Sequence, residues 1–194
     1  MDINILCIGD SIIGGYHNVW GENRSNDEKD LLFCPLHIHL TDGFYSDIRK
    51  NSNTIEFSGF TIEDMEKEIK LLLDNVYNPT NIIYSGGVNN ILLNGENGFD
   101  VFSKLKNIIL YLSDKCENLI ILIPSNKNLD TYICFGESEE ETKNRINEVN
   151  KFRNLLIDSK YNVIDTNDFE LDDCIHLSPK GIKDLSIIVK NKLI

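Results

Sequence analysis

Several turns in this 194-residue sequence contain side chains that could carry out chemistry. An apolar run ending in Gly9 leads into Asp10 and Ser11, and a serine on such a turn can project its hydroxyl into a crevice. Far along the chain, His176 comes three residues after Asp173, so the carboxylate can accept the ring N–H and orient the imidazole. A hydroxyl, a carboxylate and an imidazole in this chain order indicate acyl-transfer chemistry.

Two more turns carry groups that can stabilise a developing negative charge. Gly59 follows the second candidate strand, and a glycine lets the backbone approach a ligand closely. Asn89 and Asn90 follow a third run, and side-chain amides can donate hydrogen bonds into the same crevice. Each turn alone is typical of ordinary turn and capping chemistry. Their occurrence together, after separate strands, favours a catalytic site.

The elements that must position these residues alternate in type along the chain. Short β-branched runs predict strands at 3–8, about 54–57, 81–85, 119–123 and 162–164. Apolar residues at intervals of three and four predict helices at 62–76, 100–112, 137–158 and 179–193. We therefore expect an α/β fold, a three-layer α/β/α sandwich around a five-stranded parallel sheet, in a single domain over 1–194. The ligand site of such a sheet lies beyond the carboxyl ends of its strands.

Local capping signals support two of these helices. Thr61 and Asp64 resemble a capping box with aspartate in place of glutamate, and Ser178 with Pro179 forms an N-cap followed by proline. In the region 12–53 the sequence allows a helix between 31 and 50. Within it, Tyr16, His17 and Trp20 either line an acyl or leaving-group pocket or simply pack on the first helix. Tyr132 and Phe135, in the loop 125–137, could shape substrate entry.

Composition excludes several classes of partner. The formal net charge of −12, without a basic patch, repels phosphate backbones and anionic lipids, so we expect no nucleic-acid partner and no membrane insertion. No apolar run approaches the roughly 18 residues that span a bilayer, and no signal peptide is indicated, so we expect a cytoplasmic protein. The five cysteines form no CxxC pair and are expected to be reduced, mostly buried thiols. His37 and His39 lack an evident third ligand, so we expect no metal.

The four turns together resemble the SGNH, or GDSL-type, hydrolase family. The matching blocks follow the family's order and extend from Gly9 to His176: Gly9-Asp10-Ser11-Ile12 is similar to the GDS(L) block, Gly59 to the second-block glycine, Gly87-Val88-Asn89-Asn90 to GxND, and Asp173-Cys174-Ile175-His176 to DxxH. Two residues depart from the pattern. Ile12 stands where leucine is frequent, and Asn90 stands where the family has an acid.

The resemblance implies a flavodoxin-like fold and a serine hydrolase that cleaves carboxylic esters without a cofactor. Ser11 would be the nucleophile, His176 the general base and then acid, and Asp173 the residue that orients His176. The oxyanion hole would use the backbone N–H groups of Ser11 and Gly59 and the side-chain amide of Asn89.

The substrate class stays open between several alternatives. A 194-residue chain leaves little room for a lid, which favours short-chain or carbohydrate-linked O-acetyl esters. The alternatives are a lysophospholipase or thioesterase acting on longer acyl chains, and a catalytically silent binding domain of the same fold. A response regulator or a flavin-binding flavodoxin fits the strand pattern, but gives the turn from Asp173 to His176 no role.

Overall fold

The fold is built around one parallel sheet. The computed structural model describes residues 5–14, 54–57, 59–75, 78–127, 129 and 138–193. Among these residues the sheet has five strands: β1 (Ile5–Gly9), β2 (Thr54–Glu56), β3 (Asn81–Ser85), β4 (Asn118–Ile123) and β5 (Val163–Asp165). Their spatial order is β2-β1-β3-β4-β5, and every neighbouring pair is parallel. This is the flavodoxin-like order, so the predicted fold class is confirmed.

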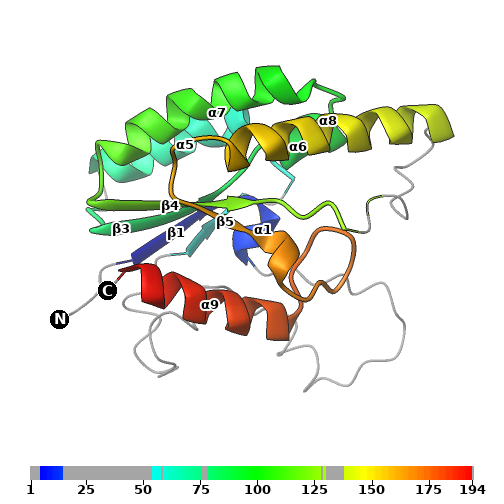
Figure 1. Cartoon of the computed structure of the whole chain (residues 1–194). Helices are drawn as coiled ribbons and strands as arrows, with labels where there is room; N and C mark the ends of the chain where they lie inside the picture. The colour runs from blue at the N-terminus through cyan, green and yellow to red at the C-terminus, as the bar shows by residue number, and fades with distance from the viewer. Residues whose placement is uncertain are drawn as a thin grey trace, which may run out of the picture.

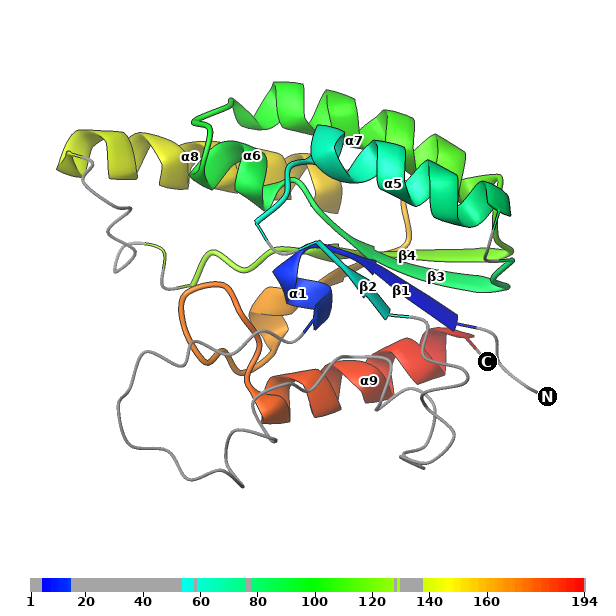
Figure 2. The same cartoon turned by 180° about the vertical axis from the view of Figure 1, so that it is seen from behind.

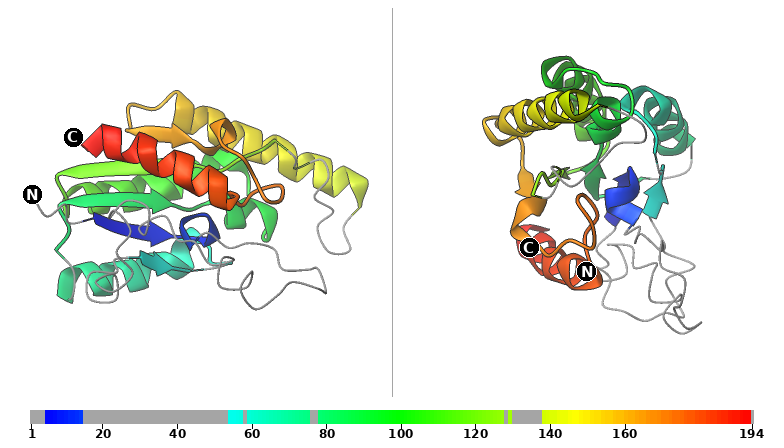
Figure 3. Two further views of the ribbon diagram at one scale, coloured as in Figure 1. Left: turned by 90° about the horizontal axis from the view of Figure 1, so that it is seen from below. Right: turned by 90° about the vertical axis from the view of Figure 1, so that its right-hand side faces the viewer.

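Helices cover both faces of the sheet (Figure 1). On one face lie α5 (Ile62–Asn75), α7 (Gly98–Ser113), α8 (Glu139–Ile157) and the short α6 (Val88–Leu92). On the other face lies α9 (Pro179–Leu193), and the end-on view of Figure 3 separates the three layers. The helix α1 (Ser11–Gly14) is a single turn directly after β1.

The central strands are buried because they lie between two helical layers. All five residues of β1 and all five of β3 are buried, as are the last four residues of β4. Their sequences are continuous apolar runs rather than alternating patterns, which is typical of a parallel sheet covered on both faces. Burying each such Leu or Ile side chain stabilises the fold by about 1.5–3 kcal/mol.

The predicted helix α5 forms with the expected buried face and cap. Ile62, Met65, Ile69 and Leu73 are buried. The side chain of Thr61 accepts a hydrogen bond from the backbone N–H of Asp64, and the Asp64 carboxylate accepts from the backbone N–H of Thr61. The capping box with aspartate in place of glutamate is thereby confirmed.

The boundaries of other elements differ slightly from the predictions. Helix α9 begins and ends where the sequence indicates, whereas α8 begins at Glu139 because Ser138 and Glu141 form a capping box there. The single turns α1 and α6 were not predicted, since four or five residues are too few to show a helical period. A 3₁₀ turn, η2 (Thr166–Asp168), follows β5.

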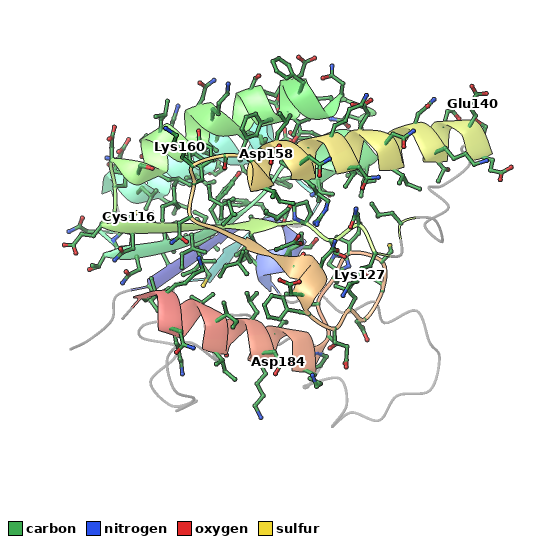
Figure 4. All side chains as sticks on the ribbon, in the orientation of Figure 1. Cys116, Lys127, Glu140, Asp158, Lys160 and Asp184 are labelled. Atoms are coloured by element: carbon green, nitrogen blue, oxygen red, sulfur yellow. The ribbon has the colours of Figure 1, made fainter. Side chains whose placement is uncertain are left out.

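The amino and carboxyl ends of the strands can be told apart in Figure 4. Cys116 lies just before β4 at one end of the sheet, and Lys127 lies just after β4 at the opposite, carboxyl end. Helix α1 and the loop between η2 and α9 also lie at this carboxyl end, as both Figure 1 and Figure 2 show. The predicted site residues therefore lie where a doubly wound sheet places its ligands.

Some predictions concern residues outside the described part of the chain. These are the helix between 31 and 50 and the roles of Tyr16, His17, Trp20, His37, His39, Tyr132 and Phe135. Of the five cysteines, three are described: Cys7 and Cys174 are buried and Cys116 is half-buried. Within the described residues, no helix is both long enough and apolar enough to cross a membrane.

Candidate active site

Ser11 is held at the carboxyl ends of the strands because β1 and β3 approach each other closely there. Gly9 pairs with Ser85 in the parallel register, and a Cβ atom at Gly9 would overlap the Ser85 carbonyl. The backbone N–H of Asp10 donates to that same carbonyl at 3.2 Å. Because Gly9 also has a φ of +151°, only glycine fits this position, and the chain then turns directly into α1 with Ser11 as its first residue.

His176 reaches Ser11 from a loop that closes on itself before α9. Leu171 and Leu177 form an antiparallel bridge, and the backbone N–H of Asp172 donates to the carbonyl of His176 at 2.9 Å. Ser178 then caps α9 by accepting a hydrogen bond from the backbone N–H of Gly181. The predicted cap is confirmed, and it fixes the loop that presents the imidazole.

Three side chains from opposite ends of the sequence meet in one hydrogen-bonded cluster. The hydroxyl oxygen of Ser11 lies 2.8 Å from Nε2 of His176, and Nδ1 of His176 lies 2.7 Å from Oδ2 of Asp173. A carboxylate can only accept, so the ring proton belongs on Nδ1, which leaves Nε2 to accept the proton of the Ser11 hydroxyl. The arrangement suits removal of that proton by the imidazole.

Asp173 is fixed independently of the imidazole. Its Oδ1 accepts the backbone N–H groups of Ile175 and His176, each at 2.7 Å. Burial alone would raise the pKa of the Asp173 carboxyl, but the hydrogen bonds and charge of His176 and the backbone donors together hold that pKa below its ordinary value. Asp173 is therefore ionised at neutral pH and can stabilise an imidazolium.

The two other predicted site residues lie in neighbouring segments at the same carboxyl end of the strands. Gly59 lies between β2 and α5 and has a φ of +76°, a conformation that favours glycine. Asn89 lies in α6, and its side-chain amide donates to the carbonyl of Phe60 at 3.0 Å. That bond uses one of the two hydrogens on the amide nitrogen. The structure thus brings Asn89 against the loop that contains Gly59.

A backbone hydrogen bond connects the segment before Gly59 to the strand that leads to Ser11. The backbone N–H of Phe57, two residues before Gly59, donates to the carbonyl of Gly9 at 2.8 Å. The strands that lead to Ser11 and to Asn89, β1 and β3, are neighbours in the sheet. The chain adds β2 on one side of β1 and then adds β3, β4 and β5 on the other side, so the connections change direction between β1 and β3. Doubly wound folds bind their ligands at this switch point.

Asp10 and Ser85 support the turn that carries Ser11, a role that the sequence analysis missed. Asp10 is 1% exposed, and its Oδ1 accepts the Ser85 hydroxyl at 2.6 Å and the backbone N–H of Ile12 at 3.2 Å. Its Oδ2 has no hydrogen-bond partner among the described residues. Burial raises the pKa of the Asp10 carboxyl, against smaller opposing effects from Ser85, Ile12 and the charge of His176.

The raised pKa of Asp10 predicts a pH dependence of stability. When a carboxyl has a higher pKa in the folded state, it does not lower the free energy of unfolding at a pH below its ordinary pKa of about 3.9. The free energy of unfolding then falls as the pH rises through the folded-state pKa. The variant Asp10→Asn does not titrate. The free energy of unfolding of the wild type, minus that of the variant, is therefore expected to fall as the pH rises above about 4.

Urea unfolding across this pH range measures that difference. Asp114→Asn, which removes one charge from an exposed position after α7, serves as the control. A difference between wild type and Asp10→Asn that stays constant with pH would show that Asp10 carries no raised pKa.

Comparisons with known proteins give different results for the sequence and for the fold. No protein-family model matches the chain. No curated protein matches its sequence. Solved structures do match in three dimensions, and several of them cover nearly the whole chain.

Three of the matching structures serve as examples. A member of the lipolytic G-D-S-L family from Veillonella parvula is 17% identical with a TM-score of 0.60, covering 98% of this chain and 96% of its own. A carbohydrate acetylesterase family member from Sinorhizobium meliloti is 13% identical with a TM-score of 0.57, covering 97% and 96%. A lipase/acylhydrolase from Enterococcus faecalis is 17% identical with a TM-score of 0.54, covering 97% and 94%. The chain therefore has the fold of the SGNH, or GDSL-type, hydrolases.

Proposed function

We propose that this protein is a serine esterase that hydrolyses carboxylic esters through an acyl-enzyme. The observation that carries the proposal is the hydrogen-bonded cluster of Ser11, His176 and Asp173, with separations of 2.8 Å and 2.7 Å. A serine hydroxyl is a weak nucleophile until a base accepts its proton, and here a base lies in direct contact with it. The names of the structural neighbours, which include an acetylesterase and a lipase, support ester hydrolysis.

In the proposed mechanism the Ser11 oxygen attacks the ester carbonyl carbon while Nε2 of His176 takes the hydroxyl proton. The resulting tetrahedral intermediate places a negative charge on the former carbonyl oxygen. Backbone N–H groups of Ser11 and Gly59 and the Asn89 amide would donate to that oxygen, and each such donor typically contributes about 3–4 kcal/mol to the transition state.

The second half of the reaction uses the same residues. His176 returns its proton to the departing alkoxide, so the alcohol leaves and the acyl group remains on Ser11. Water then attacks the acyl carbon as His176 accepts its proton, and Ser11 recovers that proton when the acid is released. Asp173 would hold the ring and stabilise its positive charge throughout.

Within this class we propose short-chain or carbohydrate-linked O-acetyl esters as substrates. Acetylesterases among the structural neighbours, including a carbohydrate acetylesterase from Sinorhizobium meliloti, support this choice. An enzyme for longer acyl chains would gain affinity with length, because each additional buried methylene contributes about 0.8 kcal/mol.

Two measurements on the wild-type protein test the proposal. It is expected to hydrolyse p-nitrophenyl acetate and to be labelled by a fluorophosphonate, with the label mapped to the peptide of Ser11. A rate that rises up to acyl chains of about eight carbons would instead favour the lysophospholipase or thioesterase alternative. A protein that neither turns over any ester of the series nor reacts with the fluorophosphonate would be the silent binding domain.

A further inference from the structure

Asn90, the residue that departs from the family's GxND block, is fully bonded in the interior. It is 0% exposed and lies in α6, next to Asn89. Its Oδ1 accepts the backbone N–H of Ile62 at 2.9 Å. Its Nδ2 donates to Oε2 of Glu63 at 2.8 Å and to Oε1 of Glu96 at 2.9 Å. Both hydrogens of the amide therefore meet carboxylate oxygens.

Lys104 completes this group by pairing with both carboxylates. It contacts Glu63 on one side and Glu96 on the other. We call these four residues, Asn90, Glu63, Glu96 and Lys104, the Asn90 cluster. Although burial tends to raise the pKa of Glu63, the hydrogen bonds from Lys104 and Asn90 outweigh it, and the pKa lies below its ordinary value. Glu63 is thus ionised at neutral pH.

An aspartate would not fit in place of Asn90. Ionised carboxylates only accept hydrogen bonds, so the oxygen that replaced Nδ2 would face two carboxylate oxygens with no hydrogen between them. The cluster would then hold three carboxylates against one ammonium group. Like charges at such separations disfavour ionisation or force the side chains apart. The two glutamates therefore account for the amide at this position.

The location of the cluster connects it to the candidate site. Asn89 donates to the carbonyl of Phe60, and Asn90 accepts from the backbone N–H of Ile62. Two consecutive residues of α6 thus hold the segment 59–62 at two points, close to the beginning of α5, which lies beside α6 in Figure 2. The backbone of Glu96 also donates to the carbonyl of Asn90, closing the other end of α6.

From these contacts we propose that Asn90 is a positioning residue of the oxyanion hole. Its amide, held between Glu63 and Glu96, fixes the segment 59–62 against α6. It thereby sets the spacing between the backbone N–H of Gly59 and the side-chain amide of Asn89. The inference rests on the esterase proposed above for its catalytic readout, whereas the structural role of the cluster does not depend on that activity.

The test combines Asn90→Asp with removal of the opposing carboxylates. Asn90→Asp is expected to lower kcat per active site by up to about 100-fold with little change in KM, because displaced donors weaken transition-state binding more than substrate binding. Counting active sites by the p-nitrophenol burst excludes a loss that merely reflects unfolded protein. Asn154→Asp, which adds the same charge on the exposed side of α8, is expected to retain wild-type kcat.

Rescue supplies the decisive comparison. Adding Glu63→Gln or Glu96→Gln to Asn90→Asp provides an amide that can donate to the new carboxylate, so each double variant is expected to recover most of the lost kcat and melting temperature. The same glutamine substitutions in the wild-type background give no gain, because Asn90 already donates there. A gain in the Asn90→Asp background without a gain in the wild-type background distinguishes the proposed charge conflict from general damage.

Each outcome decides the proposal. If Asn90→Asp does not fold but the double variants fold and turn over ester, the proposal is supported. Double variants no better than Asn90→Asp, or an Asn90→Asp protein that equals the wild type in kcat and melting temperature, overturn it. Should the wild type hydrolyse no ester, the esterase proposal fails by itself, and the role in the oxyanion hole fails with it. Melting temperatures would then still report whether the carboxylates dictate the amide.

Discussion

Replacing Ser11 with alanine is expected to reduce kcat for p-nitrophenyl acetate by about 10⁶-fold, the size of loss seen when a serine nucleophile is removed. The reason is that His176 then has no hydroxyl to deprotonate, and no acyl-enzyme can form. The Ser11→Ala protein is also expected to lose labelling by the fluorophosphonate. Steady-state kinetics and intact-protein mass spectrometry measure the two effects.

Ser113→Ala is the matched control for this loss. Its hydroxyl donates to the carbonyl of Ile109 within α7. Ser113 is the last residue of α7, which leads to the amino end of β4, opposite the carboxyl ends where Ser11 lies. The control is expected to keep wild-type kcat and labelling. If Ser11→Ala retained wild-type turnover, Ser11 could not be the nucleophile.

Asp173→Asn is expected to lower kcat by about 10⁴-fold while leaving the fold intact. Oδ1 of Asp173 accepts two backbone N–H groups, a role that only the oxygen of an asparagine can keep. The amide nitrogen of the variant would then face Nδ1 of His176 and donate to it. The ring proton would move to Nε2, where it prevents the imidazole from accepting the proton of Ser11.

Steady-state kinetics together with thermal unfolding check this prediction. Asp184→Asn, which removes a charge from the exposed side of α9, is expected to keep wild-type kcat. An Asp173→Asn protein with normal kcat would mean that this carboxylate does not set the tautomer of His176.

Most of the fold could be predicted because its signals are local. Continuous apolar runs indicated buried strands, and β3 and α9 have the bounds that the pattern predicts. The proximity of Ser11 and His176 followed from a general rule, that residues after parallel strands gather at one edge of the sheet. Their roles in catalysis, and those of Gly59 and Asn89, stay predictions.

The details that could not be predicted depend on pairing between distant residues. Ser85 is an ordinary strand-end serine in the sequence, and only the register of β1 against β3 places it beneath Asp10. Asp165 is a similar case: the predicted strand stopped before it, yet β5 includes it and its carboxylate pairs with the buried Arg153. Likewise, nothing near Asn90 in the sequence indicates that its amide bonds to Glu63, or that Lys104 pairs with that glutamate.

The contact between Ser11 and His176 spans 165 positions of the chain. Loop closure over such a distance is entropically unfavourable until the intervening sheet has formed, so we expect this contact to form after the sheet. During synthesis, a nascent chain presents its serine long before residue 176 leaves the ribosome. Under the proposed mechanism, we therefore expect ester hydrolysis only after folding has brought His176 to Ser11, and none from partly folded forms.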